Sequence, residues 1–370
     1  MGLFLQFLTV KLFSFENSPL VRILLAKNIH SIQVSSSNKK KKEISLEFFS
    51  PKGELKKKQK IQQLTLCSLN KNNEKKLKKY TSLIYRLKSI FPIYWEEKLF
   101  RGDLLVYKST TGNYCDLVNV IHLEQYLQWL LAKEMHPDWP IEALKAQAIA
   151  ARSYTLNRIN HNIYYSTRYY DLENSQKDQV SGDARDENEN TFKAIMETLG
   201  LVLVSSNTNS IIPGFFHSKC GGSTLVPHKI WPSKIQEIVG VKCPYCHTLG
   251  MGSWIYYSEK NQLLDTMKKL LPNKKPLFTL SQNDSVNNHT FFNIKKSSIR
   301  NIIGTNKVPS NQYKIEVNPN HDQIKFIGIG HGHGVGLCQF GALKMAQLGK
   351  TAPEIVEFYF PKLRIQRRYE

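Results

Sequence analysis

The segment from about residue 120 to 160 constrains the fold more than any other, because it contains two helical patterns separated by a sharp interruption. Apolar residues recur first at three- and four-residue spacing, at Leu123, Tyr126, Leu127, Leu130 and Leu131. The sequence MHPDWP then breaks the pattern, and a second repeat runs from Ile141 to about Ile159. Pro140 suits the first turn of that second helix, where its missing N–H would have no partner anyway. We therefore predict a helix, a corner and a second helix.

A basic region precedes these helices. The chain has 51 Lys and Arg against 30 Asp and Glu, a net charge of +21, and residues 1–110 hold 22 of the basic and 8 of the acidic side chains. Apolar runs at 20–34, 46–50 and 104–109 are typical of strands, and the lysine runs between them are typical of solvated turns. Such a charge favours a polyanionic partner: nucleic acid, an anionic envelope polymer or a membrane surface. We expect a β-rich domain that could contact the cell envelope peripherally.

The remaining patterns set the domain organisation. Helix signals at 191–200, at 259–271 and in two closing helices after 340 alternate with strand signals such as 201–205. We therefore predict an α+β fold with a basic β-rich domain at 20–112 and a larger domain at 113–370. No run of about 18 uncharged apolar residues occurs, which excludes a polytopic membrane protein. Residues 1–19 start with an apolar stretch that lacks a preceding basic residue, so they form either an atypical export segment or a leading strand.

Glu134 is the first candidate for chemistry. It stands at the C-terminal end of an apolar helix, where the helix dipole disfavours a negative charge. Burial raises the pKa of a carboxyl, so shelter from Met135, Trp139 and the corner would let this group act as a general acid near neutral pH. The alternative is a solvent-exposed glutamate beside Lys133. Both interpretations fit its position.

Soft metal ligands form a second pattern. His217-x-x-Cys220 and Cys243-x-x-Cys246 are separated by 22 residues, a spacing typical of a tetrahedral structural Zn²⁺. We predict one zinc ion held by these four residues, with His247 or a water molecule as rivals for the fourth position. A disulfide of Cys243 with Cys246 or Cys220, or free buried thiols, are the alternatives.

The glycine-rich segment GIGHGHGVGLCQFGA, at 328–342, is the third pattern. Glycines lack Cβ atoms, so backbone N–H groups here could approach a ligand closely, with His331 and His333 beside them. The segment is not a phosphate loop, because no Lys-Ser/Thr follows its last glycine. A tight turn with buried histidines is the alternative.

Several blocks resemble one family. YLQWLLAKEMHPDWPIEALKAQAIAARSYTL is similar to the signature of the stage II sporulation protein D (SpoIID) family, which includes peptidoglycan lytic transglycosylases and modifier proteins of cell-wall amidases. The loop Gln179–Gly182 and the blocks ETLGLVL, FFHSKCGGST, CPYC, HGHGVGLCQFGALKMAQLG and PEIVEFYF follow in the family's order, so the resemblance covers roughly 115–360. Ser181 replaces a usual tyrosine, Leu337-Cys338 replaces Met-Ser, and 272–310 resembles an insertion.

This resemblance implies a lytic transglycosylase in the periplasm or cell envelope. Glu134 would be its single acid and base, the segment around His333 would line the same cleft, and zinc would lie near that cleft. Cleavage between N-acetylmuramic acid and N-acetylglucosamine would leave 1,6-anhydromuramyl ends during cell-wall remodelling. One carboxyl suffices because the sugar's own C6 hydroxyl closes on C1, whereas an ordinary glycosidase needs two carboxylates.

Two rival functions remain. A catalytically silent member could bind glycan and activate a separate cell-wall amidase. A zinc-containing nucleic-acid binder is less favoured, because the lysines cluster away from the cysteines and no recognition helix surrounds CPYC. We expect peptidoglycan, and no nucleic acid, as the partner.

The second predicted helix contains candidate substrate contacts. Lys145 and Arg152 are seven residues apart, about two turns, so they share one helical face. We predict that they contact the anionic glycan or orient Glu134. A solvated basic stripe is the alternative. Four further residues are predicted polar contacts: Gln147, Gln179, His333 and Gln339.

Overall fold

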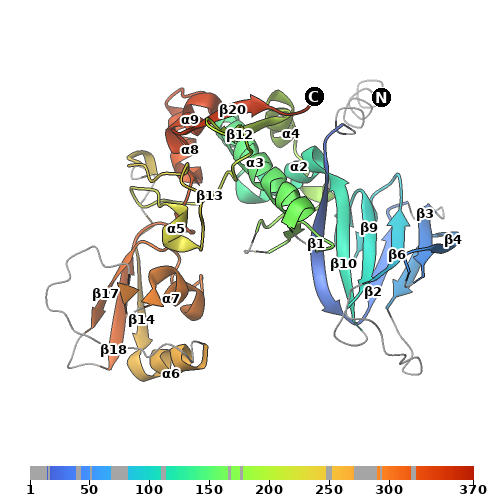
Figure 1. The fold of residues 1–370 in the computed structure, drawn as a ribbon, viewed down its shortest axis with the longest axis horizontal. Helices are drawn as coiled ribbons and strands as arrows, with labels where there is room; N and C mark the ends of the chain where they lie inside the picture. Colours follow the sequence, from blue (N-terminus) through green and yellow to red (C-terminus); the bar gives the residue numbers. More distant parts are fainter. Residues whose placement is uncertain are drawn as a thin grey trace. The chain divides into compact units, whose positions relative to one another are not determined.

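The computed structural model describes residues 15, 17–38, 43–50, 52–67, 82–109, 114–165, 168–175, 178–246, 252–270, 290–291, 294–317 and 322–370. Most of residues 1–19, the lysine runs at 39–42 and 75–79, and His247 lie outside these ranges. Two compact units divide the chain (Figure 1): unit 1 comprises 1–138, 152–202 and 367–370, and unit 2 comprises 139–151 and 203–366. Within the described ranges, no helix is long and apolar enough to cross a bilayer.

Two sheets dominate unit 1. Their strand orders are β11-β1-β10-β9-β6-β3-β4 and β5-β2-β7-β8. The strands are β1 (Leu20–Ile29), β2 (Ile32–Ser36), β3 (Ile44–Phe49), β4 (Leu55–Ile61), β5 (Gln63–Leu66), β6 (Ser82–Lys88), β7 (Ile93–Trp95), β8 (Lys98–Phe100), β9 (Asp103–Lys108), β10 (Cys115–His122) and β11 (Leu172–Glu173). Strands at all three predicted apolar runs are confirmed. The larger sheet continues past the predicted boundary at 112, since β10 pairs with both β1 and β9.

The predicted helix, corner and helix are confirmed. Helix α2 (Leu123–Glu134) buries the apolar residues named from the sequence, and it ends where Met135 adopts extended backbone. Pro137 comes two residues later and disfavours helical backbone at His136, so the helix cannot continue through the corner. Helix α3 (Ile141–Tyr165) then begins directly after Pro140 and contributes to both units. Unit 1 also contains the short 3-10 helix η1 (Ala184–Asp186) and helix α4 (Glu189–Glu197).

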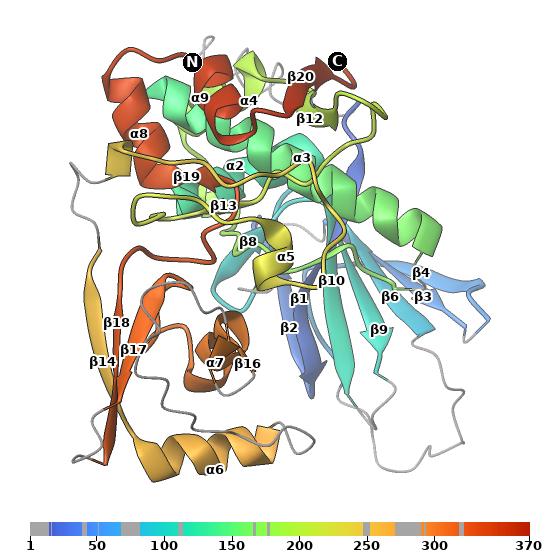
Figure 2. The same cartoon turned by 60° about the vertical axis from the view of Figure 1, so that its left-hand side comes forward.

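Unit 2 combines small sheets with short helices (Figure 2). Its strands are β12 (Leu201–Ser205, which begins in unit 1), β13 (Phe216–His217), β14 (Trp254–Glu259), β15 (Thr290–Phe291), β16 (Ile294–Lys295), β17 (Tyr313–Val317), β18 (Gln323–Gly328), β19 (Leu337–Cys338) and β20 (Leu363–Arg367). Its other helices are α5 (Pro227–Ile230), α6 (Lys260–Leu270), α7 (Lys296–Ile303), α8 (Gln339–Gln347) and α9 (Ala352–Tyr359).

A separate apolar core lies within unit 2. Leu263 of α6 and Ile299 of α7 pack with Tyr313, Ile324 and Phe326 of the sheet β14-β18-β17. The helices predicted at 259–271 and after 340 are confirmed. Helices and sheets therefore coexist in the chain, and the predicted α+β class is confirmed.

Candidate functional site

Glu134 is the last residue of α2, at the corner predicted from the sequence. Its side chain is partly buried, the following Met135 is buried, and the Met135 N–H donates a hydrogen bond to the Leu131 carbonyl at 2.9 Å. The backbone therefore holds Glu134 on an ordered final turn. The preceding residue, Lys133, is half-exposed and forms an ion pair with Asp186 at 2.7 Å.

A buried polar network lies beside Glu134. The hydroxyls of Tyr126 and Thr155 both donate to the Gln179 side-chain oxygen, each at 3.1 Å. Burial, and next the negative charge of Glu134, raise the pKa of Tyr126 well above its usual value, so the two side chains are within electrostatic reach. Gln179 is buried, so the structure gives it a supporting role beneath the site rather than the surface position expected of a glycan contact.

Arg152 is a correction to the predicted substrate contacts. Its guanidinium is fully buried and donates to both carboxylate oxygens of Glu124 at 2.7 Å, and also to the Leu201 carbonyl at 3.1 Å. Tyr369 donates a further hydrogen bond to Glu124. A glycan cannot reach a group enclosed in this way, so Arg152 is a structural residue of unit 1.

We expect Arg152→Met to lower the free energy of unfolding by about 3–5 kcal/mol, because it leaves the Glu124 carboxylate buried without its cation. Urea unfolding would measure the change. The matched control is Lys56→Met, which breaks an exposed ion pair with Glu54 and should cost less than about 1 kcal/mol. An Arg152→Met protein of unchanged stability that no longer binds glycan would restore the substrate role.

The other predicted contacts lie in unit 2. Lys145 pairs with Glu142 at 2.7 Å, and Glu142 also accepts a hydrogen bond from the Ala352 N–H at the start of α9. Gln147 is fully buried, and neither atom of its side-chain amide has a hydrogen-bond partner among the described residues. Gln339 is buried as the first residue of α8. These positions favour packing over direct contact for Gln147 and Gln339.

His333 lies among aromatic rings. Its ring centroid is 4.9 Å from that of Trp231 and 5.7 Å from that of His217, and its Nδ1 accepts a hydrogen bond from the Val335 N–H at 3.1 Å. Burial is the main cause that lowers the pKa of His217 to about 4 and that of His333 to about 3. Both rings are therefore neutral at physiological pH, and neither supplies a positive charge for a glycan.

The glycines of 328–342 serve the chain's own packing. Gly336 has φ +73°, and a Cβ there would lie 2.1 Å from the Phe215 carbonyl oxygen. Gly332 has φ +101°, and a Cβ there would lie 2.9 Å from the His217 Cβ. The segment is pressed against residues 215–225, with Leu225 N–H donating to the Gly334 carbonyl at 2.7 Å. The tight-turn interpretation fits these contacts better than close approach to a ligand does.

Four buried cysteines form the candidate metal centre. The Sγ atoms of Cys220, Cys243, Cys246 and Cys338 all lie within 4.8 Å of one another, and none is in a disulfide. Three of them belong to the predicted set. The fourth place is taken by Cys338 instead of His217, whose Nδ1 is 3.1 Å from the Val335 carbonyl oxygen and whose Nε2 has no partner among the described residues.

The geometry of this cluster fits zinc. A tetrahedral ion with Zn–S bonds of about 2.3 Å requires sulfurs about 3.8 Å apart. The Cys220 and Cys246 sulfurs are 3.3 Å apart, and no pair in the cluster is more than 4.8 Å apart. Backbone N–H groups of Cys220 and Gly341 point at the Cys338 sulfur, at 3.3 and 3.4 Å, as is common around metal-bound thiolates. The thiols interact strongly: a hydrogen bond with Cys220 is the main cause that lowers the pKa of Cys243, whereas the pKa values of Cys220 and Cys338 are raised. The residues present can therefore hold one structural Zn²⁺.

A disulfide between Cys67 and Cys115 was not foreseen from the sequence. It joins the end of β5 to the start of β10, and so links the two sheets of unit 1 across 48 residues. The usable signal was that neither cysteine belongs to the metal motif. Cys338 was not predicted as a member of the cluster, because it lies 92 residues beyond Cys246 and shares no short motif with it.

Comparisons with known proteins agree with the motifs. Residues 111–204 match the family model described as SpoIID, stage II sporulation protein. The chain is 28% identical to stage II sporulation protein D of Bacillus subtilis, over 67% of this chain and 75% of that protein. It is 32% identical to an uncharacterized protein of Brachyspira hyodysenteriae, over 66% of each chain. It is 25% identical to the amidase enhancer of B. subtilis, of which the match spans only 39%.

Proposed function

Because this chain belongs to the stage II sporulation protein D family, we propose that it is a peptidoglycan lytic transglycosylase with Glu134 as its acid and base. The observation that carries the proposal is the place of Glu134: a partly buried carboxyl on an ordered helix end, beside the Tyr126–Gln179 network. Asp183 and Asp186, which lie further along the loop that follows Gln179, are each paired with a cation. A mechanism that needs one carboxyl suits this arrangement.

The proposed reaction consumes no water. Glu134, in its acid form, donates its proton to the glycosidic oxygen between N-acetylmuramic acid C1 and N-acetylglucosamine, and the C1–O bond breaks. The C6 hydroxyl oxygen of the muramic sugar bonds to C1, and its proton passes to the Glu134 carboxylate. The acid is regenerated, and the products are a 1,6-anhydromuramyl end and a new N-acetylglucosamine hydroxyl. General acid–base catalysis of this kind is worth about 10²–10⁴ in rate.

Mass spectrometry of digested glycan strands tests the proposal. Purified strands, with and without stem peptides, should yield products that end in 1,6-anhydromuramic acid. Products that have gained one water per cleavage would instead indicate a hydrolase with a second carboxylate. Intact strands would favour the alternative below.

Activation of a cell-wall amidase is the second candidate, favoured by the match to the protein named amidase enhancer. A silent binder would increase release of stem peptides by a purified amidase while producing no anhydro ends itself. Both activities can be measured in one reaction, so the assay separates an enzyme from an activator.

We also propose that the four-cysteine cluster holds a structural zinc ion and that the protein works in the cell envelope. Four protein sulfurs would fill all four positions around the ion, as in structural zinc sites. The metal would then contribute to folding by cross-linking segments of unit 2. The disulfide of Cys67 and Cys115 supports an oxidising compartment outside the cytoplasm. The exposed lysines of β4 support peripheral contact with anionic envelope polymers.

A further inference from the structure

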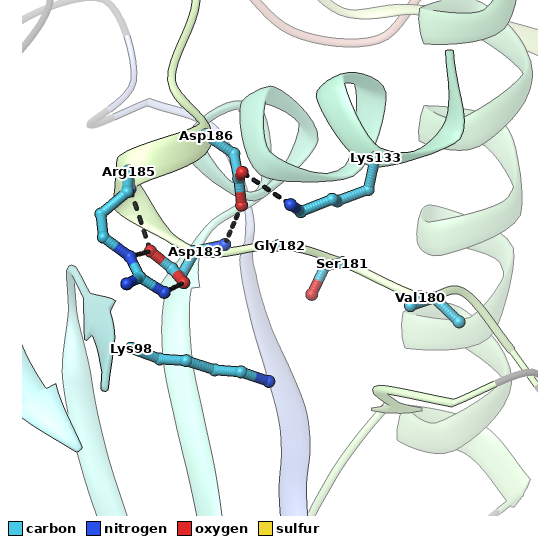
Figure 3. Close-up of a pocket in the computed structure, with 8 residues that line it drawn as sticks. All are labelled: Lys98, Lys133, Val180, Ser181, Gly182, Asp183, Arg185 and Asp186. Carbon is cyan, nitrogen blue, oxygen red and sulfur yellow. Dashed lines mark hydrogen bonds and ion pairs between the residues drawn. The ribbon is translucent and has the colours of Figure 1, made fainter. Parts of the chain in front are cut away.

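Unit 1 contains a cavity of about 490 Å³ next to the end of α2 (Figure 3). Its volume lies within the range of about 300–1,000 Å³ that is usual for small-molecule sites. The lining comes from Lys133 of α2, Lys98 of β8 and the loop from Val180 to Asp186. Lys133 immediately precedes Glu134 in the chain, and Glu134 itself is not among the lining residues.

Two ion pairs occupy one side of the cavity. Arg185 donates to both carboxylate oxygens of Asp183, at 2.8 and 2.6 Å, while Lys133 pairs with Asp186 at 2.7 Å (Figure 3). Burial works against ionisation of Asp183, but hydrogen bonds, chiefly from Arg185, outweigh it and lower the pKa of this carboxyl. The lowered pKa keeps Asp183 ionised, and each of the two acids is matched by one cation.

Lys98 leaves a surplus positive charge. Among the described residues it makes no ion pair, and Figure 3 shows its ammonium group extending into the cavity below the Ser181 hydroxyl. The backbone of β8 is tied to the loop, since the Leu99 N–H donates to Asp183. Among the described residues the Ser181 hydroxyl makes no hydrogen bond, whereas its backbone N–H donates to the Asn174 side-chain oxygen at 2.9 Å. An unmatched cation and an available hydroxyl therefore face the same space.

We propose that this cavity binds a carboxylate of the glycan strand, with Lys98 as its cation and Ser181 as a hydroxyl donor. The net charge of the lining is +1, which matches a monoanion, whereas a phosphate dianion would leave a negative excess. The subsite rests on the proposed function, because it would hold a neighbouring sugar of the strand that Glu134 cleaves. The carboxylate is either the lactyl group of a muramic sugar without its peptide or a group on the stem peptide itself.

Three tetrasaccharide probes separate these sources. One alternates N-acetylglucosamine with N-acetylmuramic acid and has free lactyl carboxylates. The second carries stem peptides, which convert the lactyl carboxylates to amides but add peptide carboxylates. The third, chitotetraose, is neutral. Calorimetric titration of the intact chain with each probe, at two salt concentrations, gives the affinities, and attraction to an exposed cation weakens as salt increases.

We expect Lys98→Gln to weaken binding of one carboxylate-bearing probe about three- to tenfold and to leave chitotetraose unaffected. The weakened probe identifies the source of the carboxylate. The matched control is Lys362→Gln, which removes the same charge from an exposed lysine just before β20, outside the cavity, and should change no affinity. Circular dichroism spectra confirm that both variants fold.

The outcomes separate the subsite from the proposed function. If the wild-type protein binds and cleaves glycan but Lys98→Gln binds all three probes as tightly, the subsite is wrong and the function stands. An equal loss for chitotetraose would also overturn the charge-based subsite. If the wild-type protein binds none of the probes, both proposals fail.

Discussion

Glu134→Gln should reduce the release of 1,6-anhydromuramyl products by about 10³, within the range usual for loss of a general acid. The amide preserves the shape of the side chain but has no proton to donate to the glycosidic oxygen. Glycan binding and thermal stability should change little, because the residue is only partly buried at a helix end. Timed digestion with quantitative mass spectrometry would measure the rate.

Asp138→Asn is the matched control for Glu134→Gln. It replaces another carboxyl of the same corner, four residues away, whose side chain is 80% exposed, and it should keep the rate within about twofold. Near wild-type cleavage by Glu134→Gln would remove Glu134 as the acid. If that variant still stimulates an amidase, the activator role is independent of the carboxyl.

Cys338→Ser should abolish stable zinc binding and loosen unit 2. The expected zinc content is about one ion per chain in the wild type and far less in the variant after dialysis against a chelator. Since the four sulfurs come from three separated segments, loss of one should lower the free energy of unfolding by at least about 3 kcal/mol. Elemental analysis and chemical unfolding measure the two effects.

His217→Gln distinguishes the structure's ligand set from the one predicted by spacing. Because His217 lies outside the cysteine cluster, this variant should retain its zinc. Loss of zinc in His217→Gln together with retention in Cys338→Ser would restore the sequence-based set. The wild-type protein could instead contain no metal and have a mass two hydrogens below that expected with the Cys67–Cys115 disulfide alone. That result would show that two cysteines of the cluster form a second disulfide.

Local patterns in the sequence predicted much of the fold. The corner between α2 and α3, the strands near 20–34, 46–50 and 104–109, and the closing helices α8 and α9 all lie where the patterns indicated. Each of these features depends on residues a few positions apart, through helical spacing, proline geometry or runs of strand-forming residues. The Cys243-x-x-Cys246 pair of the candidate metal centre is likewise visible in the sequence, because both cysteines lie on one short segment.

Groups that meet from distant segments could not be predicted in this way. Arg152 has the spacing of a surface cation, and only the fold encloses it with Glu124, 28 residues away. Cys338 joins the other cysteines because β13 and β19 pair in parallel, with His217 opposite Cys338 across more than 100 residues. From the sequence, the glycines of 328–342 could allow a ligand to approach closely. In the structure, residues 215–225 pack against several of these glycines instead.

The sequence by itself determined the position of Glu134 at a helix corner, the α+β class and the presence of a closely spaced cysteine pair that could hold a metal. Only the tertiary structure decided which cysteines cluster, that Arg152 is enclosed, and that Lys98 and Ser181, which are 83 residues apart, line the same cavity. The physical reason is one of range. Backbone preferences and hydrophobic periodicity act over a few residues, whereas burial and ion pairing depend on which distant segments pack together.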